Sequence, residues 1–199
     1  DFYHDVLLND RQASVARQYV QQRGIADETI QRFSLGFAPD AWDTLLRHAG
    51  SKGADPLLLA EAGLIRERAN RAGFYDRFRA RLIFPIQDVN GRVVGFGGRL
   101  LKDDEEQPKY LNSPETSIYH KNSILYGLSQ ARDSIRRDAQ TVLVEGYFDV
   151  LSCHQHGVTN AVATCGTALT EGHARLLKRF TPNVAVAFDS DSAGRRAAG

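Results

Sequence analysis

The sequence predicts a protein of the α/β class, in which a mixed α+β N-terminal subdomain precedes a parallel β-sheet. Three observations support this class. Up to about residue 65, apolar residues recur at helical spacing. Asn90-Gly91 separates two β-rich runs, which is a strong hairpin signal. After residue 138, three apolar runs alternate with two helical stretches, as in a parallel sheet. We therefore expect an N-terminal subdomain over residues 1–138 and a second, partial subdomain over 139–199.

The first 65 residues are expected to form short helices joined by turns. The expected ranges are 9–24, 27–38, 41–50 and 55–65. Asn9 or Asp10 is the expected N-cap of the first helix and Gly24 its stop, while Pro56 suits the first turn of the last helix. A scaffold is the simplest role for this region.

The sequence pattern changes from helical to β-rich near residue 74, where the hairpin signal begins. The second β-rich run contains Gly95, Gly97 and Gly98, which suggests a bulge or a close approach by another backbone or a ligand. The polar stretch 102–122 that follows is too long to be a simple turn. Long ordered loops often carry function, so we expect binding residues there.

Composition excludes several classes of protein. The formal net charge is only +1, so any nucleic-acid surface must be local. Cys153 and Cys165 are too few for a disulfide framework and are interpreted as core thiols in a reducing cytoplasm. No apolar run approaches the roughly 20 residues of a membrane span, and no signal peptide opens the chain. Because the chain contains no methionine and stops in mid-pattern, we expect a fragment cut at both ends.

Acidic residues follow two of the expected parallel strands. Glu145 ends the run "TVLVEG", and Asp189 and Asp191 end "NVAVAFDSD". Ligands bind beyond the carboxyl ends of such strands, and a spacing of two points both aspartates to one side. Converging carboxylates repel unless a cation lies between them, and oxygen-only ligands suit Mg²⁺. Asp149 lies one helical turn after Glu145. Taken singly, each acid fits a helix cap or a solvated loop equally well.

Basic and polar residues gather upstream. Arg77, Arg79 and Arg81 lead into the run "LIFPI", where an i, i+2 spacing would line three guanidiniums along one side to hold phosphates. Arg99 is a further candidate, with an ordinary exposed arginine as the alternative. The segment "KYLNS" supplies the densest polar cluster, which by itself also fits a turn before a helix. The candidates for nucleotide or template contacts are therefore Arg77, Arg79, Arg81, Arg99, Lys109, Tyr110, Asn112, Ser113 and, more weakly, Lys121.

The stretches "VEGYFDV" and "FDSDSAG", about forty residues apart, resemble the Toprim domain of primases, topoisomerases, a recombination-mediator protein and some nucleases. The resemblance implies a Rossmann-like parallel sheet. It implies that Glu145 is the family's invariant acid and that Asp189 and Asp191 are its metal-binding pair. It also implies that Asp149 is a further acid near the metals, so that all four acids are expected to be catalytic.

"YDRFRARLIFPIQDVNGRVVGFGGR" and "PKYLNSPETSIYHKNSILYGL" resemble the RNA polymerase domain of the bacterial replicative, DnaG-type DNA primases. This resemblance covers nearly the whole chain and implies synthesis of RNA primers by two-metal nucleotidyl transfer with Mg²⁺ or Mn²⁺. The implied partners are a single-stranded DNA template, ribonucleoside triphosphates, the RNA primer product and a replicative helicase, in the bacterial cytoplasm at the replisome, with no membrane. Two alternatives are a Toprim nuclease or phage primase-helicase, and a non-catalytic nucleic-acid-binding module.

The chain departs from the family pattern at its ends. In the family, a further acidic motif follows the aspartate pair, a zinc-binding module precedes this region, and a helicase-binding module follows it. None of these is present in the sequence. Zinc is therefore not expected here, and we expect the fragment to polymerise poorly.

Overall fold

The structure is a computed structural model that describes residues 1–69, 72–102, 104 and 106–188. The chain divides into two compact units whose segments alternate along the sequence. The first unit contains residues 1–24, 34–85 and 95–119, and the second contains 25–33, 86–94 and 120 onward. The units therefore do not follow a single cut in the sequence, and the boundary expected near residue 138 stays a prediction.

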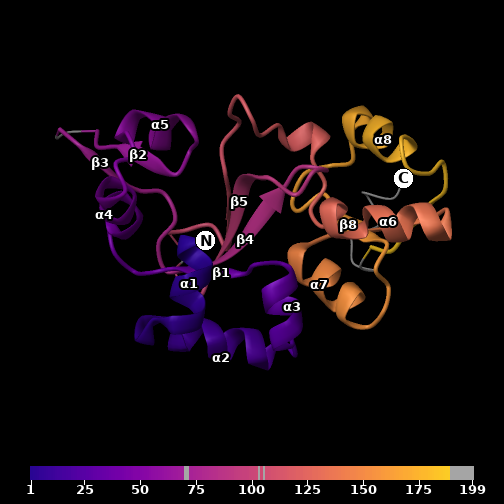
Figure 1. Ribbon diagram of the computed structural model, residues 1–199, viewed down its shortest axis with the longest axis horizontal. Coiled ribbons are helices and arrows are strands. Elements are labelled where there is room, and N and C mark those ends of the chain that lie inside the picture. Colours follow the sequence, from indigo (N-terminus) through magenta and orange to yellow (C-terminus); the bar gives the residue numbers. More distant parts are fainter. Residues whose placement is uncertain (70–71, 103, 105, 189–199) are drawn as a thin grey trace. The chain divides into compact units, whose positions relative to one another are not determined.

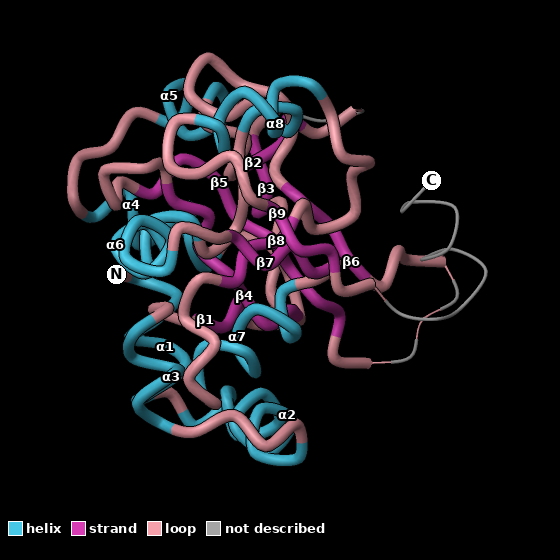
Figure 2. The backbone as a smooth tube through the Cα atoms, turned by 90° about the vertical axis from the view of Figure 1, so that its right-hand side faces the viewer, coloured by secondary structure: helices cyan, strands magenta, loops and turns pink. Residues whose placement is uncertain are grey.

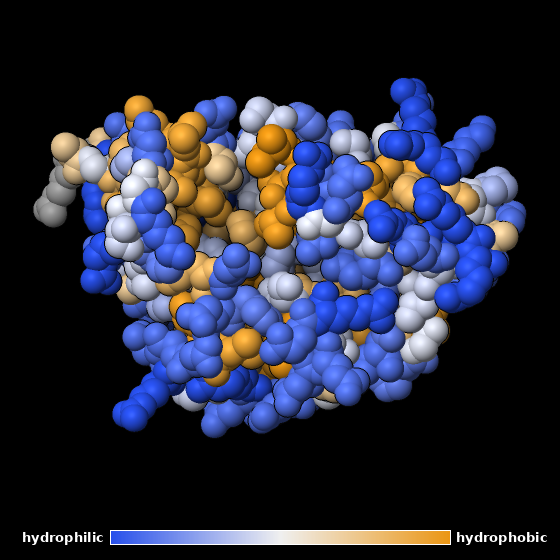
Figure 3. Space-filling model, viewed as in Figure 1, coloured by the Kyte–Doolittle hydropathy of each residue, from blue (hydrophilic) through white to orange (hydrophobic). Residues whose placement is uncertain are grey.

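The helices of the first unit are short. They are α1 (Phe2–Asn9), a 3₁₀ turn (Arg11–Ala13), α2 (Ser14–Gln22), α4 (Thr44–Ser51) and α5 (Pro56–Glu61). The carboxylate of Asp10 accepts a hydrogen bond from the N–H of Gln12 at 2.8 Å, so Asp10 caps the 3₁₀ turn that leads into α2. Gly24, at φ +70°, ends this helical stretch as predicted. Helix α5 buries none of its residues, and Figure 3 shows apolar surface there, where Leu57 and Leu58 are exposed.

A four-stranded sheet has the order β1-β4-β5-β6, and Figure 1 labels its first three strands. Its strands are β1 (Gly36–Ala38), β4 (Arg81–Gln87), β5 (Val93–Leu100) and β6 (Tyr110–Asn112), and a separate two-stranded ribbon joins β2 (Ile65–Glu67) to β3 (Phe74–Asp76). Helix α1 packs on β1 so closely that a Cβ at Gly36 would lie 2.6 Å from the Cβ of Tyr3. Tyr3 also belongs to the apolar core of this unit, with Ala38, Leu45, Phe78 and Ile83.

The helix expected over 27–38 is wrong beyond Arg32. Ser34 has a left-handed φ of +50°, which interrupts the helix, and Gly36 then pairs antiparallel with Ile83 of β4. Leu35 and Phe37 are buried apolar residues, which occur both in a helix and in a strand. Their pattern in the sequence therefore did not distinguish a strand from a continued helix.

The Asn90-Gly91 hairpin is confirmed. It joins β4 to β5, with Gly91 at φ +85°. The carboxylate of Asp88 accepts hydrogen bonds from the N–H groups of Asn90 and Arg92, at 2.9 and 3.0 Å. The Arg92 side chain returns an ion pair to Asp88 at 2.7 Å, which closes the turn.

The second unit contains the predicted parallel sheet, in the order β8-β7-β9. Figure 2 labels these three strands. Its chain order is β7 (Thr141–Val144), α7 (Tyr147–Gln155), β8 (Ala161–Ala163), α8 (Glu171–Lys178) and β9 (Val184–Val186), as the alternation of runs predicts. Helices α3 (Asp27–Arg32) and α6 (Leu128–Asp138) and a 3₁₀ turn (Lys121–Ser123) complete the described part. The core gathers Leu125, Leu128, Ala131, Ile135, Leu143, Val162 and Leu177.

One glutamine explains why α3 belongs to the second unit. The side-chain oxygen of Gln155, on α7, accepts hydrogen bonds from the N–H of Ala26 at 2.8 Å and from the hydroxyl of Thr29 at 3.2 Å. An early segment of the chain is thus tied to the parallel-sheet unit. Across the described ranges, no helix has the length and apolar character needed to cross a membrane.

Candidate catalytic and nucleic-acid-binding site

Glu145 lies at the carboxyl end of the central parallel strand. It directly follows β7, is half-buried, and its carbonyl oxygen accepts a hydrogen bond from the N–H of Cys165 at 3.2 Å. Strands β7 and β9 are parallel neighbours, with Leu143 opposite Val186. The described chain continues from β9 to Phe188, which lines the same cavity of about 240 Å³ as Glu145. Asp189 and Asp191 lie outside the described residues.

The loop after β8 forms the rest of that cavity. The lining residues besides Glu145 and Phe188 are Thr164, Gly166, Thr167, Ala168 and Leu169. Cys165 and Gly166 both have left-handed φ values, +54° and +91°, so the chain turns sharply beside Glu145. Burial raises the pKa of the Cys165 thiol, which therefore stays neutral, as expected of a core thiol.

Asp149 has a helix-capping contact. Its carboxylate accepts a hydrogen bond from the N–H of Gly146 at 2.8 Å, which satisfies a backbone donor at the start of α7. The side chain is exposed, and the residue lies at the same strand-to-helix junction as Glu145. The capping alternative that the sequence left open thus applies to Asp149, and its place beside a metal stays a prediction.

The described residues contain no cluster of three histidine, cysteine, aspartate or glutamate side chains that could hold a metal ion. Of the predicted ligands, only Glu145 lies within them. The donor set of Glu145 and two aspartates consists of oxygen atoms, which fits Mg²⁺ or Mn²⁺ rather than a softer metal. The His154 imidazole is buried and hydrogen-bonds the carbonyl of Ala161 at 2.9 Å, which is a structural role.

The expected row of three guanidiniums is wrong. Arg77 and Arg79 precede β4 rather than lying within it, so the strand spacing applies only from Arg81 onward. Arg81 is 2% exposed and donates hydrogen bonds to the carbonyls of Gly98 and Pro108, at 3.2 and 3.0 Å. Because its donors are engaged inside the protein, Arg81 does not present a guanidinium to a phosphate.

Arg79 belongs to an aromatic cluster that the sequence analysis missed. Its guanidinium lies 4.1 Å from the centroid of the Trp42 ring and 5.3 Å from that of Tyr75, and it donates to the carbonyl of Asp76 at 2.6 Å. The Arg68 guanidinium lies within 5.9 Å of the same two rings. Trp42 is 56% exposed, so the cluster offers a stacking surface with positive charge beside it. Trp42 is the chain's single tryptophan, which was the signal available in the sequence.

A second cationic cluster surrounds Tyr19. The guanidinium of Arg99 lies 4.2 Å from the centroid of the Tyr19 ring, and Arg23 donates to the Tyr19 hydroxyl at 2.7 Å. Arg99 lies opposite Tyr110 in the β5–β6 register. Burial raises the pKa of the Tyr110 hydroxyl, although 42% of this residue remains exposed. The predicted residues Arg99 and Tyr110 are therefore neighbours.

Arg77 and Asn112 also lie together, since Arg77 donates to the Asn112 carbonyl at 3.2 Å. Burial lowers the pKa of the Arg77 guanidinium, and the nearby charge of Arg66 acts in the same direction. Lys109 is exposed immediately before β6.

The two remaining candidates differ from this group. Ser113 is fully buried and its hydroxyl accepts the N–H of Phe96 at 2.9 Å, so its side chain is not exposed to a nucleotide here, and the expected contact stays a prediction. Lys121 lies in the second unit, on the 3₁₀ turn. Its backbone carbonyl oxygen hydrogen-bonds the imidazole of the buried His173 at 2.8 Å.

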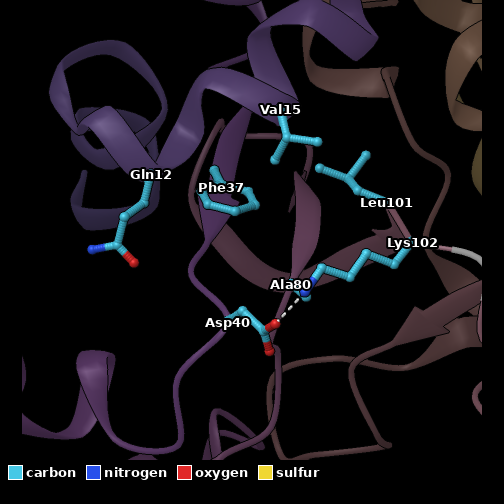
Figure 4. A pocket seen from close by; sticks show the side chains of 7 residues that line it. All are labelled: Gln12, Val15, Phe37, Asp40, Ala80, Leu101 and Lys102. Atoms are coloured by element: carbon cyan, nitrogen blue, oxygen red, sulfur yellow. Dashed lines mark hydrogen bonds and ion pairs between the residues drawn. The ribbon is translucent and has the colours of Figure 1, made fainter.

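A further small cavity lies in the first unit (Figure 4). Its volume is about 160 Å³, and it is lined by Gln12, Val15, Phe37, Asp40, Ala80, Leu101 and Lys102. An exposed ion pair of 2.6 Å between Lys102 and Asp40 lies at its rim. None of the predicted site residues lines this cavity, so it is separate from the candidate site.

Two family models match the chain. Residues 2–132 match the DNA primase catalytic core, N-terminal domain, and residues 142–199 match the Toprim-like family. The DNA primase of Deinococcus radiodurans is 52% identical over 183 residues, which are 92% of this chain and 32% of that protein. The chain thus spans about a third of the length of the curated relatives it matches.

Solved structures agree with this match. The RNA polymerase domain of Mycobacterium tuberculosis primase DnaG has a TM-score of 0.92 and 42% identity, over 99% of this chain and 65% of that one. A DnaG primase catalytic domain bound to single-stranded DNA has a TM-score of 0.87 and 46% identity, over 99% of this chain and 60% of that one. The mixed fold and the parallel sheet predicted from the sequence are confirmed.

Proposed function

This chain belongs to the DnaG-type family of DNA primase catalytic cores, and from that premise we propose that it contributes the polymerising centre of a DNA primase. The proposed reaction is the synthesis of short RNA primers from ribonucleoside triphosphates on a single-stranded DNA template. The other class considered, a non-catalytic binding module, is not favoured because the relatives over the whole chain are primases.

The proposed metal ligands are Glu145, Asp189 and Asp191, with Asp149 nearby. Toprim primase cores generally depend on divalent metal ions. The observation that carries the proposal is the parallel pairing of β7 with β9, because it brings the chain before Asp189 to the sheet edge where Glu145 lies. Mg²⁺ or Mn²⁺ bound there would supply charge stabilisation for the attacking hydroxyl and the leaving pyrophosphate. The chain's own contribution is to hold carboxylate oxygens at a half-buried strand end.

The proposed template surface is the cluster of Trp42, Tyr75, Arg79 and Arg68. A base can stack on the exposed indole while the guanidiniums attract phosphates. The similar DnaG domain bound to single-stranded DNA supports this class of ligand. Stacking tolerates any base, which suits an enzyme that samples many templates.

The proposed contacts to the incoming nucleotide come from five residues at or beside β6, which are Arg77, Arg99, Lys109, Tyr110 and Asn112; Lys121, in the second unit, is a weaker candidate that rests on the family resemblance alone. Their support is their common placement: Arg77 and Arg99 contact or pair with residues of β6, and Lys109 precedes that strand. Lysine acts on phosphate as a point charge, and the arginine fork can bind two phosphate oxygens.

We extend the proposal to the whole protein only through its relatives. Since they are about three times longer than this chain, contacts with a replicative helicase and a zinc-binding module would belong to other segments. The proposed setting is the bacterial cytoplasm, at the replisome.

A primer-synthesis assay tests the proposal. The variants Glu145→Gln and Asp189→Asn are expected to lose synthesis on a single-stranded template while keeping single-stranded DNA binding. Glu171→Gln is the matched control, because Glu171 is an exposed acid of the same unit that pairs with Arg175. Binding of Mn²⁺, followed by its electron paramagnetic resonance signal, gives a readout independent of activity. Primer synthesis and Mn²⁺ binding that are unchanged in both variants would refute the assignment of Glu145 and Asp189 as metal ligands.

A further inference from the structure

Arg81 is a buried cation that, within the described part of the chain, donates its hydrogen bonds to neutral oxygen atoms. One guanidinium nitrogen donates to the carbonyls of Pro108, Gly98 and Lys109, at 3.0, 3.2 and 3.4 Å, and the other donates to the side-chain oxygen of Gln107 at 3.4 Å. Burial lowers the pKa of the Arg81 guanidinium, and the nearby Arg79 acts in the same direction. An arginine stays protonated, so this position always carries a positive charge.

The route of the side chain depends on Gly98. A Cβ built at Gly98 would lie 3.0 Å from the Cδ of Arg81 and 2.8 Å from a ring carbon of Phe78. The missing side chain on β5 therefore leaves the space that the Arg81 side chain occupies on its way from β4 to residues 107–109. At Gly98 the close approach is made by side chains of Phe78 and Arg81, whereas the sequence predicted another backbone or a ligand.

The segment held by Arg81 leads directly into β6. The carbonyl of Lys109 also accepts the N–H of Leu100 at 2.9 Å, so the same oxygen serves β5 and Arg81. Beyond it, β6 has three residues and, within the described ranges, is the edge strand next to β5. Lys109 immediately precedes this short strand and Tyr110 begins it, so the hydrogen bonds from Arg81 hold the chain at the entry to the strand.

We propose that Arg81 is a positioning residue that fixes the entry to β6, so that Lys109 and Tyr110 are held in one orientation toward the incoming nucleotide. This inference rests on the proposed nucleotide contacts of Lys109 and Tyr110, and it replaces the expectation that Arg81 itself binds phosphate. An arginine is required because its two terminal nitrogens reach the carbonyls and the Gln107 side chain together, whereas a lysine offers a single compact ammonium.

The test combines Arg81→Lys with Lys109→Ala and the double variant. Arg81→Lys keeps the charge but loses the fork, so we expect the KM for ribonucleoside triphosphates to rise about tenfold while kcat changes by less than about twofold. In the Lys109→Ala background, the same change is expected to raise KM by less than about twofold, because the orientation of the missing lysine no longer matters. Arg47→Lys, at an exposed arginine of α4, is the matched control and should leave KM unchanged.

Amide hydrogen exchange separates positioning from the nucleotide contact. Arg81→Lys should speed exchange in residues 107–112 without lowering the protection of α1 or β1, which would signal general unfolding. Unchanged exchange over 107–112, or KM increases that multiply in the double variant, would overturn the inference. If Lys109→Ala alone leaves KM unchanged while exchange is faster in Arg81→Lys, the proposed contact of Lys109 fails and the structural role of Arg81 stands.

Discussion

Replacing Trp42 by alanine tests the proposed template surface most directly. The indole is 56% exposed, with the Arg79 guanidinium 4.1 Å from its centroid and the Tyr75 ring 5.5 Å away at 67°. Stacking of one base on an aromatic ring contributes about 1–3 kcal/mol. Loss of that surface should therefore weaken the binding of single-stranded DNA by about 5- to 150-fold.

The same substitution should have a small effect on folding. Its main structural loss is the cation–π contact with Arg79, which contributes about 0.5–1 kcal/mol at an exposed site. Arg79 keeps its hydrogen bond to the carbonyl of Asp76. We therefore expect the free energy of unfolding to fall by about 1 kcal/mol, measured by urea denaturation. A loss of binding free energy that is larger than this decrease in the free energy of unfolding cannot be attributed to unfolding.

Salt dependence identifies which interaction is lost. Fluorescence anisotropy with a labelled oligothymidylate at several salt concentrations gives the slope of log K against log salt. Trp42→Ala should leave that slope unchanged, whereas Arg79→Ala should reduce its magnitude by about 0.7, the value for one phosphate contact on a single strand. Trp42→Phe keeps an aromatic face and should retain most of the affinity. Wild-type affinity in Trp42→Ala at every salt concentration would refute the stacking argument.

Three further predictions follow from other parts of the molecule. Burial raises the pKa of the Asp76 carboxyl, although the hydrogen bonds that it accepts from the N–H groups of Leu45 and Leu46 act to lower that pKa. The folded state therefore binds more protons than the unfolded state. The free energy of unfolding should then fall as pH rises from the ordinary value of 3.8 through the raised pKa, and denaturation curves of Asp76→Asn should lack this decrease. Gly36→Ala would place a methyl group 2.6 Å from the Cβ and 2.8 Å from the backbone carbon of Tyr3, so we expect a loss of about 1–3 kcal/mol in urea denaturation, with Gly50→Ala, where no atom lies within 4 Å, as the control. Chelation of divalent ions by EDTA should abolish primer synthesis, and added Mg²⁺ should restore it; synthesis that persists after exhaustive chelation would contradict the metal proposal.

Local signals predicted much of the fold. The hairpin followed from Asn90-Gly91 because left-handed φ values at the turn are a property of a few residues. The parallel sheet followed from alternating strand and helix periods, which also located Glu145 at a strand end. Each of these conclusions depends on residues that are neighbours in sequence.

The burial of polar side chains depends on segments that are distant in the sequence. Arg81 and Ser113 both looked like surface residues, yet Arg81 is enclosed by residues 98 and 107–109, and Ser113 by the strand that contains Phe96. The helix expected through Phe37 became β1 because β4 lies beside it. In each case the partner is at least 17 residues away, so no local pattern specifies it.

The sequence by itself determined the class of fold, the turn between β4 and β5, and the place of Glu145 after β7. Only the tertiary structure decided that Trp42, distant in sequence from Arg79, shares one exposed cluster with it, and that Arg81 does not reach solvent. The physical reason is that backbone periodicity and turn geometry arise from adjacent residues. Exposure and hydrogen-bond partners depend instead on which distant segments pack against a side chain.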